Sequence, residues 1–241
     1  MSLLLRRGVI SSGKGGAFAV NSANFDGSTQ YWISSSAFTI GVNYSYACWV
    51  KPSGTGTTRT LMRISGTGPP ADIQMTMHTD DTVFMAHRNS SVGISVGLGI
   101  TALSDGTWYH VAVTYDGTDG RIYIDGVLDS TTAMIGTSLD TGFMRNVLFS
   151  GVEHFNGSQY GCLYSTGVLS QTDITELANN ASTAKCYASL SSGLVSSISN
   201  YWDLGNFNGI TGSELTDNKG SNGITLSGSP TFTGTGLSVE C

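Results

Sequence analysis

The glutamates and histidines are the side chains of this sequence best suited to acid–base or nucleophilic chemistry. The glutamates are Glu153, Glu176, Glu214 and Glu240. None of them belongs to a short carboxylate motif that would place an acid and a nucleophile on either side of a sugar, as glycan hydrolysis requires. The sequence also has neither a G-x-S-x-G nucleophile motif nor an H-E-x-x-H zinc motif. We therefore expect a protein that is not an enzyme.

The histidines favour structural roles. His110 lies within the apolar run WYHVAV, where we expect a side chain packed between strands. The others are too scattered in the sequence to suggest a metal site. They are His78, His87 and His154.

Exposed aromatic rings with a few polar groups around them could bind a glycan. Trp32, Tyr160 and Trp202 are the candidate ligand-binding residues, because turns or glycine-rich segments flank each of them. The alternative is that each ring packs in the core or covers the edge of a sheet, since large aromatic side chains are usually well buried. Both alternatives stay open at this point.

The chain has four cysteines, which allow three connectivities if all of them pair. They are Cys48, Cys162, Cys186 and Cys241. Buried, reduced cysteine is the default for a protein made in the cytoplasm. Cys241 is an exception because a terminal residue is rarely buried. We expect it to pair with Cys186, or with another subunit, once the protein reaches an oxidising environment.

The composition suits an all-β protein without a nucleic-acid partner. Only 12% of the 241 residues are charged and 32 are glycine, as expected for short strands joined by many turns. The formal net charge of −6 offers no basic face for a phosphate backbone. No apolar stretch is long enough to cross a bilayer, so we expect no membrane insertion.

The stretch from Gly106 to Thr132 predicts three consecutive antiparallel strands. Trp108 to Tyr115 is rich in aromatic and β-branched residues, and Arg121 to Ile124 alternates polar and apolar side chains. Asp125-Gly126 between two such runs is a strong hairpin signal, because a type I′ turn needs positive φ at both central residues. These strands predict the centre of an antiparallel sheet.

The motifs WYHVAVTYDG and RIYIDGV resemble the centre of the laminin-G-like, concanavalin A-like jelly-roll family. FDGSTQYW, from Phe25 to Trp32, resembles the first hairpin of the same family. The resemblance implies an all-β, two-sheet antiparallel jelly-roll sandwich. It does not select a function, because the family includes lectins, adhesion modules, glycanases and virion proteins.

Further strands are predicted on both sides of this centre. Phe38 to Val50 is expected to form one long strand, and Ser91 to Ile100 another, because it alternates large apolar residues with glycine and serine. One helix is predicted near 171–179, where Ser170 and Asp173 have capping-box spacing. The segment LSQTDITEL also resembles the short helix of the family, which begins at a Leu-Ser pair.

Calcium is a possible ligand, because relatives in this family often bind it through carboxylates in loops and hard cations prefer oxygen ligands. Asp26 and Asp217 stand in suitable loops. The alternative is that each aspartate only starts a turn through local hydrogen bonds. No other cofactor is expected.

We expect residues 1–16 to form a flexible, Gly- and Ser-rich arm, either frayed or docked on a neighbouring subunit. Residues 17–241 are predicted to form a single jelly-roll domain completed by the C-terminal segment 200–233. The competing interpretation of that segment is the start of a second module.

The absence of an N-terminal secretory pattern favours a protein made in the host cytoplasm and released by lysis. A single laminin-G-like domain with no such signal, a Gly-rich polar arm and low charge resembles accessory structural proteins of tailed bacteriophages. The resemblance implies a non-catalytic protein of a virion surface, such as a capsid decoration, head-fibre or tail-associated subunit. Its partners would be other virion proteins, further copies of itself in a homo-oligomer and a cell-surface glycan. The alternative is an extracellular bacterial carbohydrate-binding or adhesion module exported by a non-classical route. A glycan hydrolase is a distant third.

Overall fold

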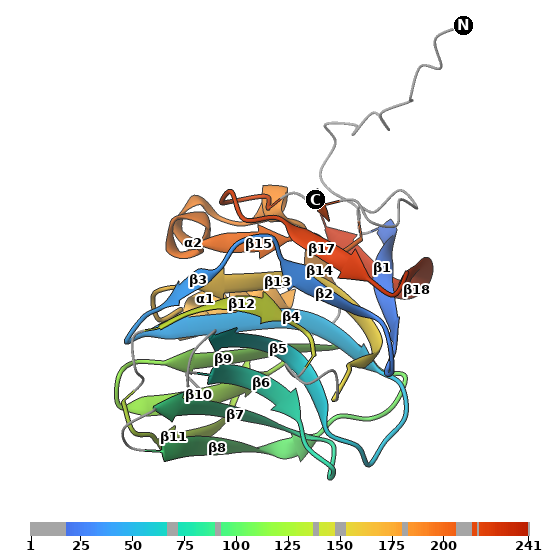
Figure 1. Cartoon of the computed structure of the whole chain (residues 1–241). Coiled ribbons are helices and arrows are strands. Elements are labelled where there is room, and N and C mark those ends of the chain that lie inside the picture. The colour runs from blue at the N-terminus through green and yellow to red at the C-terminus, as the bar shows by residue number, and fades with distance from the viewer. Residues whose placement is uncertain are drawn as a thin grey trace, which may run out of the picture.

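The computed structural model describes residues 18–66, 72–89, 93–136, 140–147, 153–179, 183–205, 214–215 and 217–240. Within these ranges the chain forms two sheets that pack face to face, with short helices against one outer side (Figure 1). The predicted arm at residues 1–16 lies outside the described residues. The two-sheet antiparallel jelly-roll architecture is confirmed.

Sheet A has the strand order β11-β10-β9-β4-β13-β1-β18-β14, and β15 pairs with β13. Its strands are β1 (Phe18–Asp26), β4 (Tyr44–Pro52), β9 (Tyr109–Tyr115), β10 (Asp119–Ile124), β11 (Val127–Ala133), β13 (Asn156–Ser165), β14 (Ala184–Lys185), β15 (Asn200–Trp202) and β18 (Thr231–Glu240). The predicted meander is confirmed as β9, β10 and β11, which pair in sequence. Asp125 and Gly126 both have positive φ in the turn between β10 and β11.

Sheet B has the strand order β16-β17-β2-β12-β5-β6-β7-β8, and β3 pairs with β12. Its strands are β2 (Tyr31–Ser34), β3 (Phe38–Ile40), β5 (Arg59–Gly66), β6 (Asp72–Met77), β7 (Thr82–Asn89), β8 (Gly93–Ala102), β12 (Asp140–Arg145), β16 (Glu214–Leu215) and β17 (Ile224–Ser227). The prediction of one long strand from Phe38 to Val50 is wrong, because this stretch forms the two strands β3 and β4. Gly41 to Asn43 carry the chain from β3 in sheet B to β4 in sheet A, so one apolar run serves both layers.

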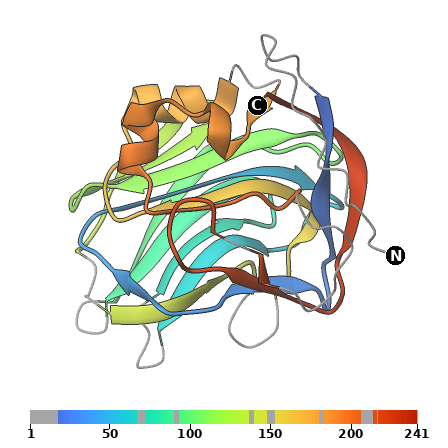
Figure 2. The ribbon, with the colours of Figure 1, turned by 90° about the horizontal axis from the view of Figure 1, so that it is seen from above.

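The helices are α1 (Gln171–Ala178), α2 (Ser192–Ser197) and a 3-10 turn, η2 (Tyr187–Ser189). The predicted capping box of α1 is confirmed: the Ser170 side chain accepts from the backbone N–H of Asp173, whose carboxylate accepts from the Ser170 N–H. Ile174 and Leu177 pack with Ala47 and Leu163 of β4 and β13. The helices therefore cover the outer face of sheet A (Figure 2). Among the described residues, no helix has the length and apolarity needed to span a membrane.

The main core fills the space between the sheets with aromatic, aliphatic and methionine side chains. The C-terminal segment contributes to both layers, because β17 pairs with β2 and β18 pairs with β1. The first and last strands of the chain, β1 and β18, therefore lie side by side in sheet A.

Candidate functional site

A polar cleft of about 390 Å³ opens at the end of sheet A where β1 and β4 stop and β13 begins. Its described lining residues are Asn24, Phe25, Lys51, Pro52, Ser53, Asp105, Gly106, Asn156, Gly157 and Ser158. They come from three strands, from the loop that follows β4 and from the loop that precedes β9. The cleft is therefore a product of topology, since no single stretch of sequence supplies it.

Strand register aligns the polar groups of the cleft. Asn24 of β1 pairs with Ser158 of β13, which pairs in turn with Lys51 of β4. Positions paired in this way point to the same face of a sheet. The Ser158 hydroxyl donates to Asn24 Oδ1, and Asn24 Nδ2 donates to the carbonyl of Thr231 at 3.3 Å. These hydrogen bonds fix the orientation of the Asn24 amide.

Two glycines let the backbone segments of the cleft come close together. Gly157 has φ +133°, and a Cβ there would lie 2.2 Å from the carbonyl oxygen of Lys51. Gly27 has φ +72°, and a Cβ there would lie 2.7 Å from the Cβ of Asn156. A side chain at either position would be strained as well as crowded. The cleft therefore requires glycine on both sides of Asn156.

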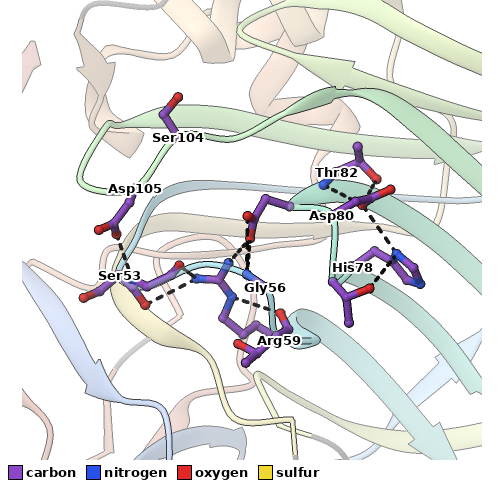
Figure 3. Close-up of polar contacts among 12 residues, drawn as sticks. Ser53, Gly56, Arg59, His78, Asp80, Thr82, Ser104 and Asp105 are labelled. Carbon is purple, nitrogen blue, oxygen red and sulfur yellow. Dashed lines mark hydrogen bonds and ion pairs between the residues drawn. The ribbon is translucent and has the colours of Figure 1, made fainter.

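Arg59 holds the loop that forms the rim of the cleft. Its side chain is only 2% exposed and donates to the carbonyl oxygens of Ser53 at 3.3 Å and Gly54 at 2.5 Å. It also forms an ion pair with Asp81 at 2.6 Å, on the turn between β6 and β7 (Figure 3). Burial lowers the pKa of Arg59, and the charge of Asp81 opposes that shift. Arg59 thus joins the rim of the cleft in sheet A to a turn of sheet B.

Asp105 closes the other side of the rim. Its carboxylate accepts from the N–H of Gly54 at 2.8 Å, and the N–H of Gly106 donates to the carbonyl of Pro52 at 2.9 Å. The N–H of Ser53 donates to the carbonyl of Asn156 at 3.0 Å. The loop after β4 is therefore bound to the loops before β9 and before β13.

The chemistry of the cleft is that of hydrogen bonding. Its polar side chains are two amides, two hydroxyls, one ammonium and one carboxylate, and Phe25 and Pro52 add apolar surface. The described lining contains no histidine, cysteine or glutamate. Such a set offers donors and acceptors to a hydroxyl-rich ligand.

The three aromatic residues predicted to bind a ligand lie inside the protein. Trp32 and Trp202 are 0% exposed and their rings lie 6.0 Å apart between the sheets, while Tyr160 is 1% exposed. Trp32 Nε1 donates to the side chain of Gln159 at 2.9 Å. Rings buried in this way cannot stack on a glycan. Flanking turns and glycines indicated exposure, but these residues pack in the interior.

The two aspartates predicted as calcium ligands each accept several protein hydrogen bonds. Burial would raise the pKa of Asp26, but backbone N–H donors, Thr29 first among them, lower it well below its usual value. Asp217 is 5% exposed and accepts from Asn200 and from the N–H groups of Tyr201 and Gly220. No group of three or more metal-ligating side chains was found in the described part of the chain. Calcium binding stays a prediction.

The cysteines divide into two kinds. Cys48 and Cys162 are buried and free, and burial, with the neighbouring Cys48, raises the pKa of the Cys162 thiol. Cys186 is disulfide-bonded. Cys241, the predicted partner, lies outside the described residues, so this pairing stays a prediction.

His110 packs on Trp49 with a ring distance of 5.5 Å, and burial lowers its pKa to about 3.

No local motif predicts the cleft, because Asn24, Lys51 and Ser158 are brought together only by strand pairing. A family model described as the concanavalin A-like lectin/glucanases superfamily matches residues 25–175. A search of curated proteins found no match.

Solved structures that share the fold include the following two. The first is a proposed carbohydrate-binding protein from Bacteroides ovatus, with a TM-score of 0.68 and 15% identity over 92% of this chain. The chain spans 61% of the length of that protein. The second is a heptameric SAP-like pentraxin from Limulus polyphemus, with a TM-score of 0.54 and 12% identity over 66% of this chain and 82% of the pentraxin. At these identities the likeness shows the fold alone.

Proposed function

Because the chain belongs to the concanavalin A-like lectin/glucanase superfamily, we propose that it is a carbohydrate-binding module without catalytic activity. The glycan would lie in the cleft formed by β1, β4 and β13. The observation that supports this most directly is the alignment of Asn24, Ser158 and Lys51 across three paired strands. The description of the Bacteroides ovatus protein as carbohydrate-binding supports the same function.

The cleft suits sugar hydroxyls better than a charged or wholly apolar ligand. Amide and hydroxyl groups can donate and accept, as a sugar hydroxyl can. Lys51 and Asp105 give one charge of each sign, so the described side chains of the cleft have no net formal charge. Phe25 and Pro52 are buried, and Phe25 belongs to the main core, so recognition would depend on the polar groups of the cleft. A neutral or weakly charged glycan therefore fits best.

A direct test is binding to a panel of bacterial polysaccharides by calorimetry. Asn156→Ala should weaken binding by about fivefold, because one hydrogen bond to a ligand is typically worth about 1 kcal/mol. Ser53→Trp should abolish binding, since the large ring would fill the rim of the cleft. Ser221→Trp is the matched control: Ser221 is also exposed and does not line the cleft.

Two outcomes contradict this proposal in different ways. Failure of the native chain to bind any polysaccharide argues against a carbohydrate-binding module. Binding that survives Ser53→Trp and Asn156→Ala unchanged places the glycan elsewhere on the molecule. Release of sugar from any polysaccharide would instead revive the hydrolase.

The virion role and the corresponding location stay predictions. Washed particles that contain this chain at a stoichiometry set by capsid or tail symmetry would support them, and mass spectrometry of purified particles is the measurement.

A further inference from the structure

The exposed large apolar side chains of the described residues concentrate at one side of the sandwich. Four of the eight are on β8, with exposed fractions of 53% for Ile94, 43% for Val96, 59% for Leu98 and 76% for Ile100. Two more, Val127 and Leu128, are on β11. Strands β8 and β11 lie beside each other at the lower edge of Figure 1, and Asp129 of β11 accepts from the N–H of Ile100 at 2.6 Å. A row of exposed apolar side chains such as that on β8 marks an interaction site.

Strand β8 has the reverse of the usual amphipathic pattern. Its large apolar residues face solvent, and its inward positions are taken by small ones such as Gly97 and Gly99. A Cβ on Gly99 would lie 2.6 Å from the carbonyl oxygen of Val83 and 2.9 Å from an Asp129 carboxylate oxygen. A one-residue slip that turned the large side chains inward would drive them into these atoms. The close approach therefore locks the apolar row to the outside.

The row is also close to symmetric about its centre. A two-fold axis between Val96 and Leu98, in the plane of the contact and perpendicular to the strand, would place Ile94 over Ile100 of a second copy. It would likewise place Val96 over Leu98. An isologous contact needs this self-complementarity. If Ile94 of one copy meets Ile100 of the other, Ile100 of the first copy must also meet Ile94 of the second.

The neighbouring strand β7 fits the same axis. Phe84 pairs with Leu98 and Ala86 pairs with Val96, so the half-exposed Phe84 ring of one copy would lie over the small, buried Ala86 of the other. Arg88, which is exposed and pairs with Ile94, would lie over Thr82 of the second copy. The side chain and N–H of Thr82 bind Asp80, whose carboxylate is 63% exposed. Opposite charges would therefore meet at both ends of the contact.

We propose that this face of β8 and β7 binds a second copy of the chain in an antiparallel, two-fold dimer. The whole chain carries a net charge of −6, but β8 itself has no charged residue, so like charges do not meet in the row. A strand rises about 3.3 Å per residue, so β8 is roughly 33 Å long, and two strands cover on the order of 400 Å² per copy. This is below the ~800 Å² per partner of a standard interface, so the dimer dissociates on dilution.

Sedimentation velocity of the full chain over an approximately thousandfold concentration range tests the proposal. The native chain should be a dimer at the highest concentration and a monomer at the lowest. Leu98→Lys should be monomeric throughout. Val42→Lys is the matched control, because Val42 is 58% exposed but lies between β3 and β4, and it should follow the native curve. Asp80→Asn keeps an acceptor for Thr82 but removes the charge, and should raise the dissociation constant about 2- to 5-fold.

Cysteine pairing tests the register independently of any loss of folding. Ile94→Cys mixed with Ile100→Cys should form a covalent dimer when oxidised glutathione accepts the two electrons and protons of the thiols. Each single variant alone should not, because its two cysteines would lie far apart across the axis. A native chain that stays monomeric throughout, equal disruption by Val42→Lys, or cross-linking of the single variants overturns the proposal. If the chain is monomeric and Leu98→Lys instead abolishes polysaccharide binding, the face binds ligand and the dimer is again excluded.

Discussion

The cleft in sheet A and the apolar row on β8 are two surfaces of one sandwich built in opposite ways. The cleft assembles residues from β1, β4, β13 and the loop before β9, and hydrogen bonds hold each part in place. The row on β8 comes from ten consecutive residues, and its orientation depends on how closely two glycines let the strand approach its neighbours. The polar surface therefore exists only once distant strands have paired, whereas the apolar row is supplied by a single strand.

This difference decides how each surface should respond to change. A cleft held by a network fails when one connecting residue is removed, even if that residue does not line it. A row fixed by register tolerates substitutions elsewhere and responds to anything that moves the strand. The following predictions separate the two surfaces.

The largest effect is expected at Arg59. Arg59→Met removes the donor of the Ser53 and Gly54 carbonyls and leaves Asp81 with the N–H of Gly56 but without its countercharge. Breaking a buried ion pair on one side costs about 3 kcal/mol. Chemical denaturation at a concentration that favours the monomer should show this loss in the free energy of unfolding. Glycan binding should also fall, while association through β8 persists.

Lys219→Met is the control for stability, because Lys219 is exposed and belongs to neither surface, so its replacement should change the free energy of unfolding by less than about 0.5 kcal/mol. A similar loss in both variants would mean that Arg59 has no special role in holding the rim. Loss of dimerisation in Arg59→Met would mean that the two surfaces are coupled.

A smaller effect is expected from acid, through His110 in the layer of sheet A that supports the cleft. Burial lowers the pKa of this imidazole to about 3, whereas the unfolded chain takes up the proton near the ordinary value of 6.5. The stabilisation is therefore fully present above about pH 6.5 and is lost progressively as the pH falls toward 3. Between pH 7 and pH 5 this amounts to about 2 kcal/mol.

His110→Gln should flatten that part of the stability profile, as measured by denaturant unfolding at a series of pH values. His87, a buried residue of β7, also has a pKa lowered by burial, and His87→Gln provides the comparison from sheet B. An unchanged slope between pH 7 and pH 5 in His110→Gln would show that other groups produce the acid sensitivity.

Local features of the fold could be predicted from the sequence, and features that depend on long-range pairing could not. The meander from Trp108 to Thr132 and the helix after Ser170 follow from turn chemistry and capping that involve near neighbours. The split of Phe38 to Val50 between two sheets escaped prediction, because an apolar run looks the same whichever sheet receives it. Whether Trp32 and Trp202 bind a ligand or pack in the core stayed open for a similar reason: flanking glycines describe the backbone and leave the direction of the ring undetermined.

The same limit applies to the two candidate surfaces. The alternation from Ser91 to Ile100 correctly predicts a strand, but alternation does not say which face lies inside. The neighbours of Gly97 and Gly99 decide that, and they come from β7 and β11. The cleft needs the register of three strands before Asn24, Lys51 and Ser158 meet.

The smallest predicted effect tests whether the glycines orient β8. Gly99→Ala places a methyl group 2.6 Å from the carbonyl oxygen of Val83, so the strand must shift outward. Overpacking typically costs 1–3 kcal/mol, and β8 is at the end of its sheet and can move, so we expect about 1 kcal/mol. Gly234→Ala in β18 is the control, because a Cβ there meets no atom within 4 Å. Gly99→Ala should also weaken the dimer while glycan affinity stays at the native value, since Gly99 contributes nothing to the cleft. If both alanine variants have the same stability and the same dimerisation, the inward glycines do not fix the strand, and the exposed row would need another cause.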